Sequence, residues 1–179
     1  MFESGRRGPL RVFVHGDASL PAVEVARSVV LAGGYQIVTS VEAADVAIAP
    51  LLTKILTKAE YSAPRHGTLI FHPSLLPRHR GRDAIRWTYA LREPFTGVTW
   101  FWCDEGTDTG PICEQEILPI DLFTRPGEFY AREVLPALAR TLTWALADLA
   151  RGIVRRRPQN EAAATYERPI AREQPSGHR

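Results

Sequence analysis

The chain contains 179 residues, of which 45% are hydrophobic, 23% charged and 9% aromatic. This length and apolar fraction predict one folded domain with a hydrophobic core and exclude a wholly disordered chain. The formal net charge is only +2, whereas nucleic-acid binders usually carry a large basic excess, so we expect no nucleic-acid partner. No apolar run approaches the roughly 20 residues of a membrane span, and no signal-peptide pattern opens the chain. We therefore expect a cytoplasmic protein with no membrane partner.

The first third of the chain predicts a strand–helix–strand unit. Residues 1–9 are polar and rich in Gly and Arg, which indicates a flexible arm before a folded domain over residues 10–152. Strands are predicted for residues 11–16, 35–39 and 45–50, with a helix from Pro21 to the Gly33-Gly34 pair. This order favours a parallel, Rossmann-like sheet. The first strand–helix turn lacks the GxGxxG pattern, so we expect no nicotinamide or flavin cofactor.

The rest of the chain alternates strands, shaped loops and one long helix. Strands are predicted for residues 68–72, 97–103 and 112–118, the last near a sheet edge, and helices for residues 83–91 and 126–151. Pro136 predicts a kink or break in the long helix, because proline lacks the N–H that an inner helical turn uses. Residues 153–179 are predicted to form an extended C-terminal tail.

A histidine and an acidic loop follow two of the predicted strands. His72 ends the apolar strand 68–72, and residues 104–111 (DEGTDTGP) follow the strand 97–103. Ligands gather at the carboxyl ends of parallel strands, and a histidine–carboxylate pair there can perform acid–base chemistry. The alternative is a buried core histidine beside a solvated acidic turn. The His, Cys and acidic residues match no metal-ligand spacing, so we expect no metal.

Several separated motifs together resemble the folate-dependent formyltransferase family. They are HPSLLP at residues 72–77, Gly81, GVT at residues 97–99 and DEGTDTG at residues 104–110. The stretches 63–81, 84–88, 101–102 and 164–167 look most similar to the N-terminal hydrolase domain of 10-formyltetrahydrofolate dehydrogenase. The resemblance covers residues 45–168. It implies a Rossmann-like formyltransferase fold of the α/β class, with a mostly parallel sheet and helices on both faces.

The same resemblance implies a catalytic pair, His72 and Asp108, that acts on 10-formyltetrahydrofolate as formyl donor. Most members carry an asparagine two residues before the histidine, where this chain has Ile70. An oxyanion donor is thereby lost, which typically costs about 2.7–4 kcal/mol. The hydrolase domain of 10-formyltetrahydrofolate dehydrogenase also looks to have isoleucine here, so the resemblance implies hydrolase-like transfer of the formyl group to water or to a small acceptor. Two alternatives stay open: an N-formyltransferase acting on an amino group of a sugar, amino acid or carrier-bound metabolite, and a folate-binding module without catalysis that needs a partner.

The resemblance also implies a set of binding residues around this pair. The loop 49–57 matches the segment whose backbone holds the pterin ring, and the acidic loop closes over the other side. The residues expected to bind folate are Lys54, Ile55, Leu56, Asp104, Glu105 and Gly106, and those expected to bind substrate are Ser74, Leu75, Arg78 and Gly81. Arg78, Arg80 and Arg82 are candidates to meet an anionic group, with solvated surface charge as the alternative.

The front of the chain departs from the family pattern. The predicted strand 35–39 leads almost directly into the strand 45–50, so about thirty residues that form a strand–helix unit in relatives are missing. This shortening is expected to expose apolar surface, which a second copy of the chain or another protein could cover. The chain also lacks the C-terminal domain of methionyl-tRNA formyltransferases, which argues against tRNA as acceptor.

Overall fold

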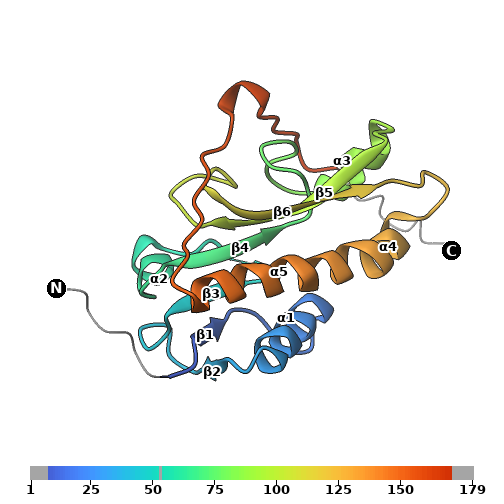
Figure 1. Ribbon diagram of the computed structural model, residues 1–179. Helices are drawn as coiled ribbons and strands as arrows, with labels where there is room; N and C mark the ends of the chain where they lie inside the picture. Colours follow the sequence, from blue (N-terminus) through green and yellow to red (C-terminus); the bar gives the residue numbers. More distant parts are fainter. Residues whose placement is uncertain (1–7, 53, 171–179) are drawn as a thin grey trace, which may run out of the picture.

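The structure is a computed structural model that describes residues 8–52 and 54–170, and its centre is a six-stranded sheet (Figure 1). The strands are β1 (Arg11–Val14), β2 (Gln36–Val38), β3 (Val46–Ala49), β4 (Thr68–His72), β5 (Phe95–Trp102) and β6 (Ile112–Pro119). Their order in the sheet is β2-β1-β3-β4-β5-β6. The pairs among the first four strands are parallel, while β5 is antiparallel to both β4 and β6. The α/β class and the mostly parallel sheet are thus confirmed.

Every strand and helix expected from the sequence is present, with bounds within a few residues. The helical elements are α1 (Pro21–Ala32), α2 (Lys58–Ser62), α3 (Ala84–Ala90), α4 (Pro126–Phe129), the π-helical turn η1 (Tyr130–Val134), α5 (Leu135–Ala150) and the 3-10 turn η2 (Glu161–Ala163). Two short elements, α2 and η2, are not predicted from the sequence. Helix α2 is capped by Thr57, whose hydroxyl accepts from the backbone N–H of Glu60 in a capping box.

The long C-terminal helix contains a π-helical turn next to Pro136, where the sequence predicts a kink or break. Within η1 the N–H of Leu135 donates to the carbonyl of Tyr130, five residues back, so one residue more than usual fits into the turn. Pro136 then falls in the first turn of α5, where a missing N–H leaves no intrahelical bond broken. Helical structure therefore runs from α4 through η1 into α5, and the irregularity is a π turn rather than a break.

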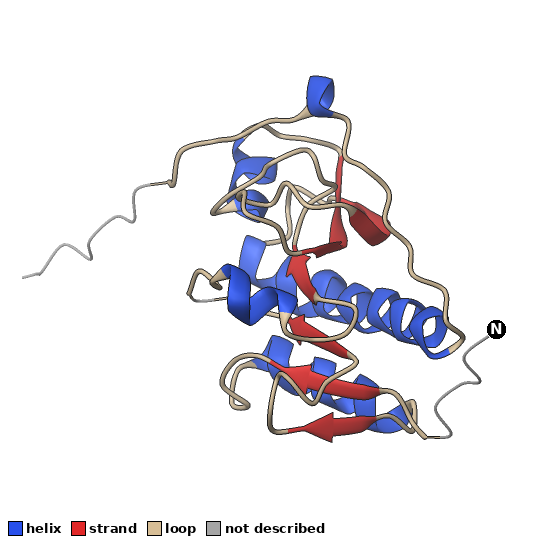
Figure 2. Ribbon diagram, turned by 90° about the vertical axis from the view of Figure 1, so that its left-hand side faces the viewer, coloured by secondary structure: helices blue, strands red, loops and turns tan. Residues whose placement is uncertain are grey.

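Two hydrophobic clusters lie on opposite faces of the sheet. The larger one contains Val12, Leu69, Trp100 and the buried side of α5, and it is covered by α1 and α5 packed side by side (Figure 2). The smaller cluster consists of Ala49, Ile70, Leu76, Phe101 and Ile112. Neighbouring residues of a strand point to opposite faces, so Leu69 enters the helical side while Ile70 faces the loops that follow β4. No helix formed by the described residues is long and apolar enough to cross a membrane.

The carboxyl ends of β1, β3 and β4 meet at one edge of the sheet, because these strands are parallel. Residues 39–45 join β2 to β3 without a helix, which leaves β2 as an edge strand, in line with the shortened front. Residues 153–170 leave α5, climb past the strand ends to η2 and return toward α3 (red in Figure 1). This segment, here called the C-terminal strap, is mostly extended, and it lies against loops more than 40 residues earlier in the chain.

We predict that replacing Gly110 by alanine destabilises the domain. Gly110 is buried at the end of the acidic loop, and a Cβ there would lie 1.7 Å from the backbone oxygen of Trp102. That oxygen belongs to β5, which is paired with a strand on each side, so the backbone would have to shift to relieve the clash. Overpacking of this kind typically costs about 1–3 kcal/mol. Urea denaturation measures the loss.

The matched control is Gly127→Ala in α4, where a Cβ meets nothing within 4 Å. Alanine in a helix is favoured over glycine by roughly 0.5–1 kcal/mol, so this variant should gain stability. Equal unfolding free energies for the two variants would contradict the close approach at Gly110.

Candidate active site

His72, the last residue of β4, lies at the centre of the site and is only 6% exposed. Its Nε2 lies 2.7 Å from the carbonyl oxygen of His79. A carbonyl can only accept a hydrogen bond, so Nε2 must carry the hydrogen. The nitrogen left for chemistry is Nδ1, which lies 3.6 Å from Oδ2 of Asp108.

Asp108 approaches His72 from the acidic loop between β5 and β6. The same carboxylate oxygen, Oδ2, accepts a hydrogen bond from the backbone N–H of Gly81 at 2.7 Å. The backbone of Asp108 has φ 55°, a left-handed conformation that aspartate tolerates better than most residues. The structure thus brings together the two side chains that the motifs single out. Their 3.6 Å separation exceeds a hydrogen bond, as is common for catalytic contacts that tighten when substrate binds.

The pair borders a cavity of about 790 Å³, within the usual size range of small-molecule sites. Apolar walls come from Leu51, Leu52 and Phe71, and Ile70 contributes to the same lining. Charged residues at its border include Lys54, Arg82 and Asp83, and the end of the C-terminal strap adds Pro169 and Ile170. The cavity therefore offers flat apolar surface on one side and a histidine–carboxylate pair on another.

The loop 49–57 lines one wall of this cavity, although Thr53 within it lies outside the described residues. Lys54 and Ile55 border the cavity, and Ile55 is 94% exposed. Leu56 is buried in the interior and does not line the cavity. The ammonium group of Lys54 lies 2.7 Å from Oε1 of Glu60. Hydrogen bonds from Lys54 and then from Thr57 lower the pKa of the Glu60 carboxyl to about 2.

In the acidic loop, only Thr107 and Asp108 line the cavity. Asp104 instead shapes the loop, because its Oδ1 accepts from the N–H of Gly106 at 3.0 Å and from the hydroxyl of Thr109 at 2.7 Å. Glu105 points away and pairs with Lys58 of α2 at 2.7 Å. That hydrogen bond lowers the pKa of the Glu105 carboxyl. The predicted binding residues Asp104, Glu105 and Gly106 thus surround the cavity without lining it.

Cys103, immediately before the acidic loop, is not an activated nucleophile. Burial, and then the charges of Asp104 and Asp108, raise the pKa of its thiol to about 11. A thiol with that pKa stays protonated at neutral pH, and the thiolate is the reactive form. Within residues 8–52 and 54–170, no group of three or more His, Cys, Asp or Glu side chains is arranged to hold a metal ion.

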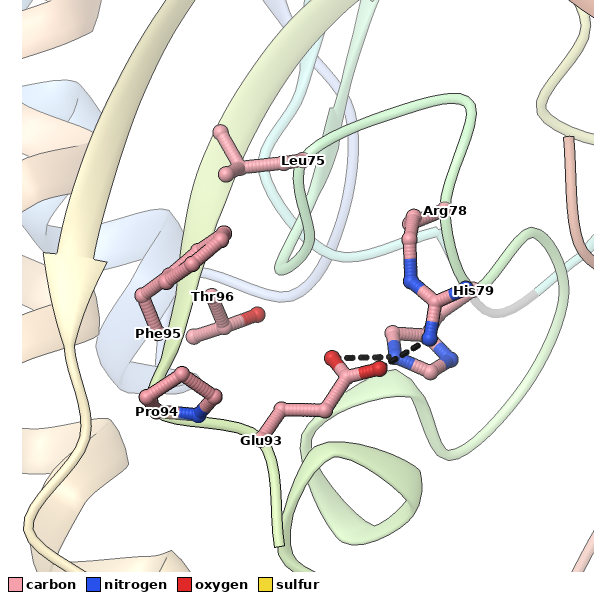
Figure 3. Close-up of a pocket in the computed structure, with 7 residues that line it drawn as sticks. All are labelled: Leu75, Arg78, His79, Glu93, Pro94, Phe95 and Thr96. Carbon is pink, nitrogen blue, oxygen red and sulfur yellow. Dashed lines mark hydrogen bonds and ion pairs between the residues drawn. The ribbon is translucent and has the colours of Figure 1, made fainter. Parts of the chain in front are cut away.

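Of the four residues expected to bind substrate, only Gly81 lines the cavity. Ser74 is fully buried, and its hydroxyl donates to the carbonyl of Arg78 at 2.6 Å. Leu75 and Arg78 line a separate cavity of about 210 Å³ (Figure 3). There the guanidinium of Arg78 pairs with Glu93. These three residues therefore shape the loop after His72 rather than the cavity beside it.

The three arginines after the HPSLLP motif have different surroundings. Arg78 pairs with Glu93, and Arg80, which is 6% exposed, pairs with Glu161 of the C-terminal strap at 2.6 Å. Arg82 is exposed and lines the large cavity, and it forms no ion pair with another described residue. Of the three, Arg82 is the one placed to meet an anionic group in that cavity.

Sequence reasoning missed the residues that hold the two site loops. His79 is buried, with Nε2 3.0 Å from Glu93 and Nδ1 3.0 Å from Glu167. Gln159 of the C-terminal strap donates to the backbone of the acidic loop. The matching ATYE segment at residues 164–167 was the available signal that the strap belongs to the domain.

Comparison with known proteins identifies the family. The family model described as formyl transferase matches residues 34–135. Among curated proteins, the chain is 39% identical over 127 residues to the cytosolic 10-formyltetrahydrofolate dehydrogenase of Mus musculus, a match that covers 69% of this chain and 14% of that protein. It is 36% identical over 135 residues to the methionyl-tRNA formyltransferase of Acidobacterium capsulatum, covering 73% of this chain and 42% of that one.

Solved structures show the same fold. HypX from Aquifex aeolicus in complex with tetrahydrofolic acid superposes with a TM-score of 0.79 at 20% identity, covering 90% of this chain and 30% of that one. An N-formyltransferase from Helicobacter canadensis, in complex with folinic acid and dTDP-3-aminofucose, gives 0.71 at 16% identity, covering 88% and 70%. The chain thus spans only a small part of the dehydrogenases and of HypX. With its motifs, its sheet and the matching model in agreement, this chain belongs to the formyl transferase family.

Proposed function

We propose that the protein takes the formyl group from 10-formyltetrahydrofolate and passes it to water or to a small acceptor. The observation that carries this proposal is the His72–Asp108 pair at the border of a cavity of about 790 Å³. The folate is a substrate here and supplies the formyl group on its N10 atom. The remaining tasks, which are binding, proton transfer and stabilisation of charge, fall to the residues of this chain.

The cavity suits a folate because a pterin needs flat apolar walls and backbone hydrogen bonds. Leu51, Leu52 and Ile55 supply such walls, and the backbone of the loop 49–57 runs beside them. This loop is braced from outside by the Lys54–Glu60 ion pair. We therefore assign pterin binding to the main chain of the loop and to its apolar side chains, with Lys54 as a brace.

His72 is assigned the central chemical role through Nδ1. When a nucleophile adds to the formyl carbon, negative charge develops on the formyl oxygen, and a positioned N–H stabilises that charge. Because Nε2 is held by the carbonyl of His79, Nδ1 is the nitrogen that can donate to the oxygen or relay a proton. The carboxylate of Asp108 lies 3.6 Å from this nitrogen and is placed to orient the imidazole ring for that step.

One observation favours a small acceptor with a negative charge, in addition to water. Arg82 lines the cavity and forms no ion pair with another described residue. A guanidinium in that position suits an acceptor with a carboxylate or phosphate, which arginine can bind with two parallel hydrogen bonds. The second candidate function is therefore N-formylation of a small amine that also carries an anionic group.

We predict that Asp108→Asn lowers kcat by on the order of 10²–10⁴-fold, the usual range for lost acid–base assistance. The amide keeps the shape of the side chain but removes the carboxylate that lies 3.6 Å from Nδ1 of His72. Release of tetrahydrofolate from 10-formyltetrahydrofolate measures the rate, and the Kd for folinic acid should stay near the wild-type value.

Asp121→Asn serves as the control, because Asp121 caps a local turn after β6 and bonds only to Phe123 and Thr124 among the described residues. It should retain full activity. A wild-type protein that binds folinic acid but releases no tetrahydrofolate, with water or with an acceptor panel, would support a binding module and overturn the enzymatic proposal.

We further predict that Ile70→Asn raises formyl transfer to amines. Ile70 lines the cavity two residues before His72, at 8% exposure, so an asparagine there would place an amide donor at the cavity border. One such donor is typically worth about 10²–10³ in rate. The measurement compares formylated product formed from an amine panel in the wild type and the variant.

Ile70→Val is the matched control, since it changes the volume at this position without adding a donor. If the asparagine and valine variants transfer formyl to amines equally slowly, the missing donor is not what limits that reaction.

A further inference from the structure

The two backbone groups that orient the catalytic pair both belong to the loop after β4. The carbonyl of His79 accepts from Nε2 of His72 at 2.7 Å, and the N–H of Gly81 donates to Oδ2 of Asp108 at 2.7 Å. His79 has φ 54°, a left-handed conformation that residues with side chains seldom adopt. A loop with this geometry needs support from outside, because such a conformation persists only where neighbours enforce it.

The C-terminal strap supplies that support (Figure 1). The hydroxyl of Thr165 accepts from the N–H of His79 at 2.8 Å, and its carbonyl accepts from the N–H of Arg80 at 3.0 Å. The N–H of Thr165 donates to the carbonyl of Pro77 at 3.0 Å. The strap therefore pairs with the loop much as a short strand would, although 86 residues separate Thr165 from His79.

Gln159 of the strap also holds the second loop of the site. Its Nε2 donates to the backbone carbonyls of Asp108 and Gly110, each at 2.8 Å. Its Oε1 accepts from Nε and Nη2 of Arg80 at 3.1 and 2.8 Å. Both donors of the amide and its acceptor oxygen are thus engaged. This single side chain bridges the loop that orients His72 and the loop that carries Asp108.

We propose that Gln159 is a positioning residue for Asp108. Its amide holds the carbonyl of a residue whose backbone has φ 55° and so fixes where the carboxylate stands relative to Nδ1 of His72. Gln159 does not line the cavity and touches no reacting group. The loss of activity expected when Gln159 is replaced rests on the proposed function, whereas the expected displacement of the Asp108 carboxylate does not.

The deciding experiment uses Gln159→Glu in the full chain. A glutamate retains oxygens that accept from Arg80, but it loses both donors and turns negative charge toward two carbonyl oxygens. We expect kcat for tetrahydrofolate release to fall on the order of 10–10²-fold, as misplacements of about 1 Å can do, with KM for the donor unchanged. Asn160→Ala is the control: Asn160 is exposed and its side chain caps η2 without touching either site loop.

Imidazole ¹⁵N NMR of His72 gives a second readout that needs no turnover. Displacement of the Asp108 carboxylate should shift the Nδ1 signal in Gln159→Glu, whereas the signal should stay in place in Asn160→Ala, which leaves Asp108 where it is. Wild-type kcat and an unshifted signal in a variant that still binds folinic acid would overturn the positioning role. If Gln159→Glu fails to fold, Gln159→Asn is used instead, because it keeps the amide on a shorter side chain. The same two measurements, kcat and the Nδ1 signal of His72, then test the positioning role. An inactive wild type would refute the proposed function alone, because the NMR comparison still tests the position of Asp108.

Discussion

The hydrogen bond between Nε2 of His72 and the carbonyl of His79 decides what the site can do, because it leaves one ring nitrogen for chemistry. A histidine whose ring nitrogens are both free could present either one to a substrate. Here the backbone fixes the ring, and Nδ1 is turned toward Asp108. This bond requires the chain to fold back within seven residues of the end of β4, so the shape of that loop is a condition for the rest of the site.

The loop keeps its shape through contacts to three other parts of the molecule. The ring of His79 is buried between carboxylates of Glu93 and Glu167, and the hydroxyl of Ser74 bonds to the carbonyl of Arg78. Leu76 packs into the smaller hydrophobic cluster on the sheet. The smaller cavity in Figure 3 lies against this support, which explains why Leu75 and Arg78 are found there. Polar and apolar contacts thus hold the same loop from opposite sides.

Much of the fold followed from sequence periodicity, and part of the site did not. The run TLIFH at residues 68–72 reads as a buried strand ending on a histidine, and β4 has those bounds. The motifs also singled out Asp108, which the structure places beside His72. Ser74, by contrast, was expected near substrate and lies buried inside its own loop. Motif spacing locates a loop, but it does not tell which side chains point into a cavity, since that depends on the backbone conformation of each residue.

Several features could be predicted from the amino-acid sequence: the α/β class, the order of the strands and helices, the pair His72 and Asp108, and the apolar replacement at Ile70. These features are local or carried by motifs, so they can be read without knowing what packs against them. Three features required the folded structure: which nitrogen of His72 is left for chemistry, which arginine borders the cavity, and that Gln159 bridges both site loops. Such features depend on contacts between residues up to 86 positions apart, and the direction of a side chain at such a contact is set by its neighbours in space.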